Sequence, residues 1–412
     1  MSPERAAGRP EPGRLRPRGS SQGGLRQYNE RVVLQAIRLH GPLPAADLAR
    51  LTHLTAQTVS IIAKRLLDDG LLLKGEPVRG RVGQPSVPLS LNPQGAYAIG
   101  IKIGRRSLDV LLVDFGGQVQ QRWALDYEVA DPGVLLPAIA QRLKDIRRKL
   151  GPERHDRVQG VGIAAPLSMG GWQQLLGLPA AVADKWQHLD LALEVGGLTA
   201  LPVTLVKDTA AACVAELVAG RGRTLKSFLY VFVDTFIGGG LVLDSHLHGG
   251  LHGNAGAIGS LPLGPAGRGG AAPPAQLLSR ASLLSLERAY AAAGLEPGAV
   301  TDHRALQAPW RRHTERWLQD AAAAVAQAVQ GAACLLDMEG VIVDGSFDRG
   351  LLQALLAATE PALQRYDWEG VARPPLLAGT IGSDARALGG ALLPLYANFA
   401  PDSDLFLKVT DE

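Results

Sequence analysis

Cysteine is scarce in this sequence, and so are the hydrophobic runs that mark export or membrane insertion. The 412 residues contain two cysteines, Cys213 and Cys334, each within an alanine-rich helical pattern where a small buried thiol is expected. This count excludes a disulfide framework and indicates a reducing compartment. The N-terminal residues lack an apolar signal segment, and no clean run of about 18 apolar residues occurs. We therefore expect a cytoplasmic protein that does not span a membrane.

Negative charge is under-represented at the start of the chain. Residues 1–90 hold 14 Lys and Arg against 7 Asp and Glu, and the totals of 42 and 39 leave 28 basic against 32 acidic residues for the remainder. A basic N-terminal part on a weakly acidic body is typical of a nucleic-acid-binding module joined to another domain. Residues 1–24 by themselves are better explained as a disordered basic tail.

Residues 25–90 predict three helices followed by a β-hairpin. The first helix has apolar residues at helical spacing and ends at Gly41 and Pro42. A short helix, "AADLARLT", and the turn "HL" lead into "TAQTVSIIAKRLLDDG", where Thr55 is the expected N-cap and Gly70 the expected stop. This order of elements has the spacing of a helix-turn-helix motif.

The third predicted helix has one apolar stripe and one short polar face. Val59, Ile62, Ala63 and Leu66 recur at helical spacing and predict the buried stripe. Gln can read adenine, Ser and Thr can reach bases or phosphates, and Lys neutralises phosphate. An ordinary solvated helix face is the alternative, and the full order of helices and hairpin favours DNA. The candidate DNA-binding residues of this helix are Thr55, Gln57, Thr58, Ser60 and Lys64.

The predicted hairpin, "LLLKGEPVRGRVGQPSVPLSLNP", surrounds a glycine-containing loop. This loop holds Arg79, Arg81 and Gln84. Arginines on a flexible loop can enter a narrow, electronegative minor groove, so the loop is a candidate wing. A plain exposed linker is the alternative.

From residue 96 the pattern alternates strands and helices and predicts an α/β body, with "AIGIKI", "DVLLVDF", "VQGVGIAA", "VTLVKD", "FLYVFVD" and "VIVDG" as strands. Together, "NERVVLQAIRLHGPLPAADLARLTHLTAQTVSIIAKRLLDDGLL" and "GRVGQPSVPLSLNPQGAYAIGIKIG" resemble the DNA-binding head of regulators of the ROK family (repressors, open reading frames and kinases). The remainder resembles the family's sugar-kinase-like body, and the resemblance covers about residues 25–400. It implies a winged helix-turn-helix on a two-lobed, actin-like ATPase fold with ligand bound between the lobes.

This resemblance also sets the expected domain boundaries. We expect a disordered basic tail (1–24), a winged helix-turn-helix domain (25–90), a first α/β lobe (91–205), a second α/β lobe (206–390), and a C-terminal helix and tail (391–412).

The motifs that a kinase of this family needs are altered. The resemblance places "KIGRR" on the family's Asp-x-Gly-Gly-Thr hairpin, so Lys102 replaces the acidic residue that serves Mg²⁺, and Arg105 and Arg106 replace the second glycine and the threonine. The family's Gly-Thr-Gly-x-Gly-Gly-Gly loop becomes "DTFIGGG", with Asp234 and Phe236 where a triphosphate needs open amide donors. We therefore expect no ATP and no kinase activity.

The sugar-facing motifs are altered as well. Asp208 matches the family's general base, but Lys207 replaces the Asn beside it, and Ala257 and Ser260 replace the Glu and His of the segment that contains Asn254. The counterpart of the family's zinc loop, "GPAGRGGAAPPAQ", has neither Cys nor His, so we expect no structural zinc. The other histidine cluster, His246, His248 and His252, lacks standard ligand spacing and is interpreted as a turn-rich hairpin.

Positive residues around the former active site make it a candidate effector site. If the resemblance holds, its members are Lys102, Arg105, Lys207, Asp208 and Asn254, with Arg106 nearby. We hypothesise a sugar or an anionic sugar derivative, such as a sugar phosphate or a uronic acid. The alternatives are that Lys207 pairs with Asp208, or that the arginines are solvated surface residues.

The sequence as a whole predicts a sequence-specific DNA-binding regulator of carbohydrate-related genes, a repressor, without enzymatic activity. The expected partners are a pseudo-palindromic double-stranded operator, a second copy of the chain in a homodimer or homotetramer, and a sugar effector that changes the spacing of the heads. Two alternatives stay open: an active sugar kinase with a fused regulatory head, and a regulator whose cleft binds no small molecule.

Overall fold

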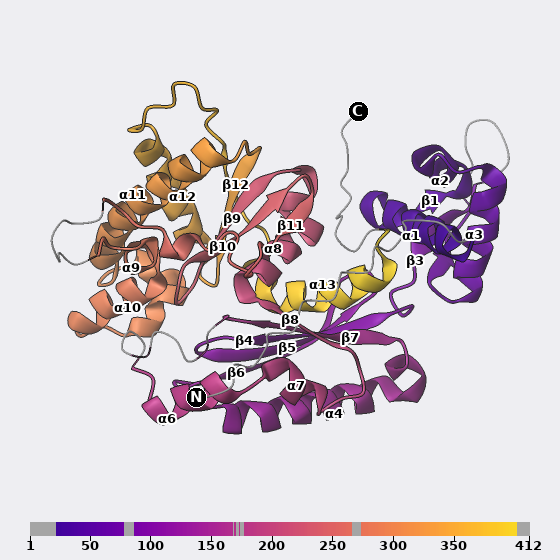
Figure 1. Cartoon of the computed structure of the whole chain (residues 1–412), viewed down its shortest axis with the longest axis horizontal. Coiled ribbons are helices and arrows are strands. Elements are labelled where there is room, and N and C mark those ends of the chain that lie inside the picture. Colours follow the sequence, from indigo (N-terminus) through magenta and orange to yellow (C-terminus); the bar gives the residue numbers. More distant parts are fainter. Residues whose placement is uncertain are drawn as a thin grey trace, which may run out of the picture.

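A small N-terminal head stands beside a body of two lobes (Figure 1). The computed structural model describes residues 22–77, 86–167, 169, 173, 177–265 and 273–401. Most of the expected tail, residues 1–21, lies outside these ranges, and the first helix already includes Gln22.

The head contains three helices and a three-stranded sheet in the order β1-β3-β2. Strands β2 and β3 pair antiparallel, with Leu72 opposite Leu91, which confirms the predicted hairpin. The loop between them carries Arg79, Arg81 and Gln84, which fall outside the described residues. The elements of the head are α1 (Gln22–His40), β1 (Leu43–Pro44), α2 (Ala45–Thr52), α3 (Ala56–Asp68), β2 (Leu72–Lys74) and β3 (Pro88–Leu91).

The turn between α2 and α3 depends on backbone conformations that the sequence encodes locally. His53 ends α2 in the left-handed region, with φ of 54°. Thr55 then caps α3, because its hydroxyl oxygen accepts a hydrogen bond of 3.1 Å from the Thr58 amide. Gly70 follows the helix with φ of 71°, so the predicted cap and stop are both confirmed.

The two lobes repeat one sheet topology. The first sheet has the order β6-β5-β4-β7-β8 and the second the order β11-β10-β9-β12-β13. In each, three antiparallel strands are followed by two parallel ones. The strands of the first sheet are β4 (Tyr97–Ile103), β5 (Ser107–Asp114), β6 (Val119–Asp126), β7 (Val158–Ala165) and β8 (Val203–Lys207), and those of the second are β9 (Phe228–Val233), β10 (Gly238–Leu243), β11 (His246–His248), β12 (Gly340–Gly345) and β13 (Leu376–Ala378). The expected two-lobed α/β body is confirmed.

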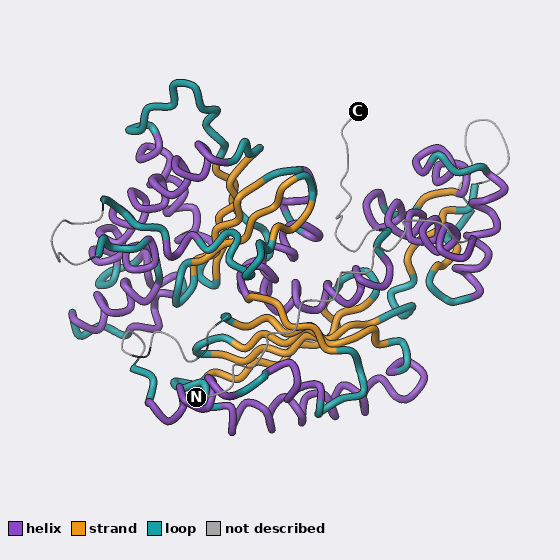
Figure 2. The backbone as a smooth tube through the Cα atoms, in the orientation of Figure 1, coloured by secondary structure: helices purple, strands orange, loops and turns teal. Residues whose placement is uncertain are grey.

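Helices cover both sheets (Figures 1 and 2). The outer face of the first sheet packs against α4 (Pro132–His155), α6 (Ala180–His188) and α7 (Leu191–Gly196). The outer face of the second packs against α9 (Leu277–Ala281), α10 (Leu283–Ala292), α11 (Arg311–Leu335) and α12 (Arg349–Leu363). Between the sheets lie α8 (Asp208–Ala219) and α13 (Ala385–Phe399). Short 3₁₀ helices are η1 (Arg221–Thr224), η2 (Ile258–Ser260), η3 (Pro297–Thr301), η4 (His303–Leu306) and η5 (Gly382–Asp384).

Glycines allow helix α13 to pack closely against both α8 and β7. A Cβ atom on Gly389 would overlap the carbonyl oxygen of Ala211 in α8, and one on Gly162 in β7 would overlap the carbonyl of Gly390. The backbones therefore touch directly, which only glycine permits. The expected boundary at 390 is wrong, because it falls inside this continuous helix, and the boundary at 205 likewise falls inside β8.

Two further expectations are corrected. Strand β6 was not among the predicted strands, because as an edge strand it is largely exposed and has no apolar run. Cys213 is buried as expected, whereas Cys334 is exposed near the C-terminal end of α11.

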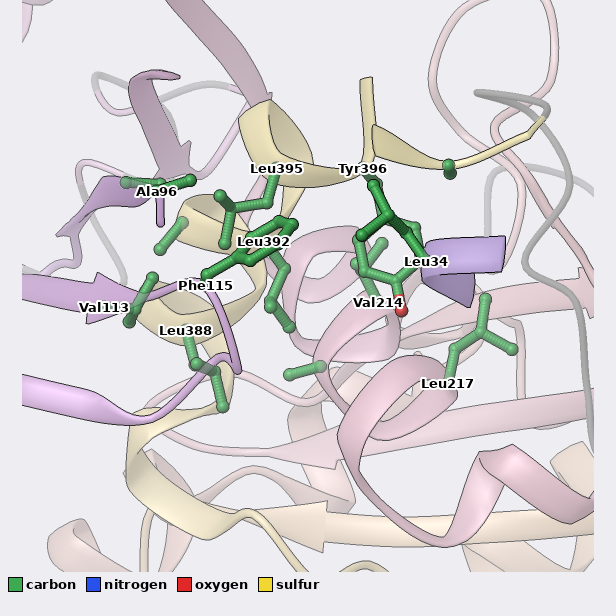
Figure 3. Close-up of a cluster of buried hydrophobic side chains, with 14 of the residues drawn as sticks. Leu34, Ala96, Val113, Phe115, Val214, Leu217, Leu388, Leu392, Leu395 and Tyr396 are labelled. Carbon is green, nitrogen blue, oxygen red and sulfur yellow. The ribbon is translucent and has the colours of Figure 1, made fainter. Parts of the chain in front are cut away.

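The head docks on the body through one apolar cluster (Figure 3). The Arg38 guanidinium of α1 lies 5.2 Å from the ring centroids of both Phe115 and Tyr396. Arg223 donates a 2.9 Å hydrogen bond to the Leu39 carbonyl. Aromatic rings from β5's end and from α13 thus hold the last turn of α1.

Candidate DNA-binding helix and interlobe cleft

Helix α3 buries one stripe and turns a polar face to solvent. Val59, Ile62, Ala63 and Leu66 are each at most 6% exposed, as predicted. Gln57, Ser60 and Lys64 are exposed, and Ile61 between them is 64% exposed. This exposed face holds three polar side chains and one apolar side chain, a combination that can bond base edges and contact thymine methyl groups.

Two of the predicted DNA-binding residues also serve the helix itself. The hydroxyl oxygens of Thr55 and Thr58 are 2.8 Å apart, next to the capping bond. Arg65 pairs with Glu30 of α1 at 3.1 Å and so fixes α3 against the first helix. Among the described residues Lys64 has no ion-pair partner within 4.0 Å, which leaves its charge for an outside anion.

A pocket of about 260 Å³ opens between the lobes. The first lobe contributes Arg105 from the β4–β5 turn and Lys207 from the end of β8, and the second contributes Asn254. Asp208, at the start of α8, lines the same pocket. Four of the five predicted effector residues therefore converge, and Ala257 and Ser260 line the same pocket.

Lys102 does not line this pocket. Its ammonium is buried, bonds to the Ser107 hydroxyl and pairs with Asp109 of β5 at 3.0 Å. Burial and the nearby Arg386 lower the pKa of Lys102, while Asp109 opposes that shift. The structure gives Lys102 a partner within its own hairpin, which corrects its expected place as an effector contact.

Lys207 and Asp208 do not form the ion pair that was considered as an alternative. Among the described residues the Lys207 ammonium and the Asp208 carboxylate form no ion pair within 4.0 Å, and Asp208 instead lies 3.8 Å from the Arg386 guanidinium. Burial lowers the pKa of Lys207, and Asp208 partly offsets this. Lys207 also lines a neighbouring cavity of about 590 Å³ on the first lobe.

Arg386, in the first turn of α13, anchors a buried ion network at the base of the cleft. Its guanidinium pairs with Asp234 at 2.5 Å and lies 5.1 Å from the Phe232 ring centroid. Burial would raise the pKa of Asp234, but Arg386 and Lys102 outweigh it and hold the pKa below its ordinary value. The network is balanced, with the cations Lys102, Arg105, Arg122 and Arg386 facing the carboxylates Asp109, Asp208, Asp234 and Asp384.

The turn between β9 and β10 is committed to contacts within the protein. The Ile237 amide donates to the Ser282 hydroxyl at 2.9 Å. The Phe236 ring lies 4.7 Å from the Arg105 guanidinium. This turn therefore presents the Asp234 carboxylate, which is paired with Arg386, and the Phe236 ring, which packs against Arg105.

A second interlobe contact lies nearby. Arg106 is partly exposed and pairs with Glu287 of α10 at 2.6 Å. Burial raises the pKa of Glu287, and Arg106 opposes the shift. The arginine that was considered a solvated residue thus joins the two lobes.

The histidine hairpin shows no metal geometry. His246 and His248 lie in β11, paired antiparallel with β10, which confirms the predicted hairpin. Within the part of the chain that the structure describes, no group of three or more His, Cys, Asp or Glu side chains is placed to hold a metal ion.

Across the described residues, none of the helices has both the length and the apolar character needed to cross a membrane.

Sequence reasoning missed Arg386, Ser282 and Glu287. Arg386 alone carried a signal, since it is a single arginine in the apolar stretch "ARALGGALL". Charged residues are rarely buried without a partner, so such a position points to an ion pair. Its partner Asp234 is too distant in sequence to be identified from spacing.

Comparisons with known proteins agree with this architecture. The chain matches the ROK family over residues 98–396 and the MarR family over residues 27–81. Protein y4fQ of Sinorhizobium fredii, described as uncharacterized, is 25% identical over 376 residues, which is 90% of this chain and 91% of that protein. The xylose repressor of Bacillus subtilis is 22% identical over 244 residues, and this match spans 59% of this chain but only 62% of the repressor.

Two solved structures show the same fold. A ROK family transcriptional regulator, a homolog of the Escherichia coli MLC protein, has a TM-score of 0.66 at 20% identity and covers 91% of this chain and 98% of that chain. A ROK hexokinase of Thermus thermophilus has a TM-score of 0.52 at 25% identity, over 72% of this chain and 97% of that chain. With a family match over most of its body and a second over its head, the chain belongs to the ROK family and carries a MarR-type winged helix at its N-terminal side.

Proposed function

We propose that this protein is a sequence-specific transcriptional regulator, a repressor of carbohydrate-related genes. The observation that carries the proposal is the head of three helices and a β2–β3 hairpin, whose α3 turns Gln57, Ser60 and Lys64 to solvent. The similarity to a xylose repressor supports a carbohydrate-related role. The α3 face enters the major groove of a double-stranded operator, and the loop with Arg79 and Arg81 reaches the adjacent minor groove.

The effector is a sugar or an anionic sugar derivative bound in the interlobe pocket. Asp208 and Asn254 supply groups that bond sugar hydroxyls, and Arg105 and Lys207 supply positive charge for a carboxylate or phosphate. Because the pocket has walls from both lobes, ligand binding favours one lobe arrangement over others. The head is attached to α13, so a change at the cleft reaches the DNA-binding surface.

The protein does not phosphorylate its ligand. Three features of the β9–β10 turn support this proposal: the Asp234 carboxylate, the Phe236 ring and the Ile237 amide, which already donates to Ser282. They leave few free backbone amides to bind a triphosphate. It uses neither ATP nor zinc and works in the cytoplasm. A sugar kinase with a fused head is the second candidate, favoured by the structural likeness to the hexokinase. Coupled ATP turnover with a hexose panel separates the two, and we expect none.

A homodimer or homotetramer presents two heads to a pseudo-palindromic operator. Two-fold symmetry places the two α3 helices in successive major grooves of one DNA face. Sedimentation equilibrium with and without operator DNA measures the oligomer and its stoichiometry.

The test is fluorescence anisotropy with the full chain. Operator DNA is selected from the region upstream of the protein's own gene or from a genomic-fragment library, and binding is titrated against salt with a panel of neutral sugars, uronates and sugar phosphates. We expect tight, sequence-selective, salt-sensitive binding that one sugar class weakens. Binding of every fragment with equal affinity would refute the regulator. Selective binding that no sugar alters would refute the effector alone.

A further inference from the structure

The C-terminal part of α4 gathers positive charge at a place that the proposed function does not use. Residues 142–157, "RLKDIRRKLGPERHDR", hold 7 Lys and Arg against 3 Asp and Glu. Residues 91–412 as a whole hold 28 against 32. Residues 142–157, which we call the basic island, are therefore positive on a body that is otherwise weakly acidic. The average composition of the body does not account for this local excess of positive charge.

The island is exposed and concave. Lys144, Arg147 and Arg148 are exposed, and they line a cavity of about 500 Å³ together with His155 and a single acid, Asp156. Burial and the neighbouring Arg147 both lower the pKa of His155. The contribution of Arg147 is that of a like charge placed beside the imidazole, and Asp156 opposes the shift.

Little of this charge is neutralised within the protein. Asp145 is shared by Arg142, at 2.9 Å, and Arg148, at 2.8 Å. Among the described residues Lys144 and Arg147 have no ion-pair partner within 4.0 Å. A helix C-terminus attracts some cations, but that effect fades within one turn. Helix α4 is broken at Gly151, with φ of 70° and ψ of 173°, so Arg147 and Arg148 lie in the last turn before the break, whereas Lys144 lies about two turns before it and outside the range of this effect.

The island lies next to the base of the head. Arg157, two residues beyond α4, donates to the Gln94 carbonyl, and its own carbonyl accepts from the Tyr97 amide. The same guanidinium packs against Gly70, just after helix α3: a Cβ atom placed on Gly70 would lie 3.1 Å from Arg157 Nη1. Figure 1 shows the C-terminal end of α4 and the head at the same end of the first lobe.

We propose that Lys144, Arg147 and Arg148 form a second DNA-contact surface that binds phosphates of the operator flank, beyond the segment held by the head. This inference rests on the proposed function, since the head must place the duplex there. Duplex DNA fits the surface because it presents a row of closely spaced negative charges, whereas a small anion would neutralise only part of it. The contact adds affinity without reading sequence.

The test compares two duplexes and two variants. One duplex ends at the edges of the selected operator, and the other carries about 10 additional base pairs on each side, one helical turn. The double variant Lys144→Gln/Arg147→Gln removes the two cations without a partner. Its control is Arg312→Gln/Arg316→Gln, which removes equal charge from exposed positions on α11 in the other lobe.

On the extended duplex, the α4 variant should bind with a shallower dependence of log Kd on log salt, by about 1.8 per subunit and so about 3.6 for a dimer that contacts both flanks, since each lost phosphate contact removes about 0.9. On the short duplex the α4 variant should have the same salt dependence as the unaltered protein. The control variant should have the same salt dependence as the unaltered protein on both duplexes. Unchanged binding of the extended duplex, or an equal loss in the control, would overturn this proposal only. Failure of the unaltered protein to select any operator would overturn the proposed function as well.

Discussion

Replacing Arg386 by methionine should destabilise the body and make its stability depend on pH in a new way. Methionine keeps the approximate length of the side chain but removes the charge that faces Asp234 at 2.5 Å and Asp208 at 3.8 Å. Two carboxylates would then share the base of the cleft without their common cation. Breaking a buried ion pair from one side costs about 3–5 kcal/mol, because the remaining charge is left uncompensated.

The pH dependence follows from the sign of the shifts. In the unaltered protein the pKa of Asp234 is held below its ordinary value of 3.8, so its stabilising contribution is present above about pH 4 and is lost as the pH falls through the depressed pKa. In the variant, burial raises the pKa with no opposing Arg386. Protonation then relieves the repulsion, so the stability difference should be large at pH 7 and shrink as the pH approaches 4.

The assay is thermal unfolding followed by calorimetry from pH 4 to pH 8. At pH 7 the transition of the body should fall by about 6–20 °C, taking about 2–4 °C per kcal/mol. The double variant Arg386→Met/Asp234→Asn should recover part of this loss, since one unpaired carboxylate is gone. A single Arg386→Met variant that melts like the unaltered protein at every pH would refute the ion network as a stabilising unit.

Four other predictions concern packing, the head and the proposed DNA-binding helix. Gly389→Ala should lower stability by about 3 kcal/mol through backbone overlap, whereas Gly331→Ala, in open space on α11, should be neutral or stabilising in the same melting assay. Arg38→Ala should loosen the head, seen as faster proteolysis between head and body, and unchanged digestion would contradict the docking role. Gln57→Ala should cost about 1–3 kcal/mol at one operator position, and Lys64→Ala should weaken all duplexes alike and lower the salt slope by about 1, as anisotropy would show.

Local patterns in the sequence were sufficient for the head. The stripe from Val59 to Leu66 and the caps at Thr55 and Gly70 are properties of neighbouring residues, so their burial and dihedrals could be predicted. Strand β6 was not predicted, because an exposed edge strand has no periodic apolar pattern in its sequence. Cys334 was wrongly predicted to be buried, because an alanine-rich sequence suggests a buried helix even where the last turn of the helix is exposed.

The cleft was predicted in part, and the missing part is nonlocal. Lys207, Asp208 and Asn254 were expected together and do line one pocket. Lys102 was expected to face a ligand, but its ammonium forms an ion pair with Asp109 on the adjacent strand. The position of Arg386 depends on how α13 packs between the lobes, and that packing is a property of the folded molecule.

The glycine contact between α13 and α8 has a mechanical consequence. Two backbones that touch without side chains between them can turn about the contact but cannot approach or slide without unpacking, so Gly389 acts as a fulcrum. Arg386 in the cleft is three residues to one side, about 4.5 Å along the axis, and Tyr396 at the head is seven residues to the other, about 10.5 Å. A tilt of α13 about this contact would therefore displace Tyr396, where the helix meets Arg38, by more than twice the displacement of Arg386 at the ion network.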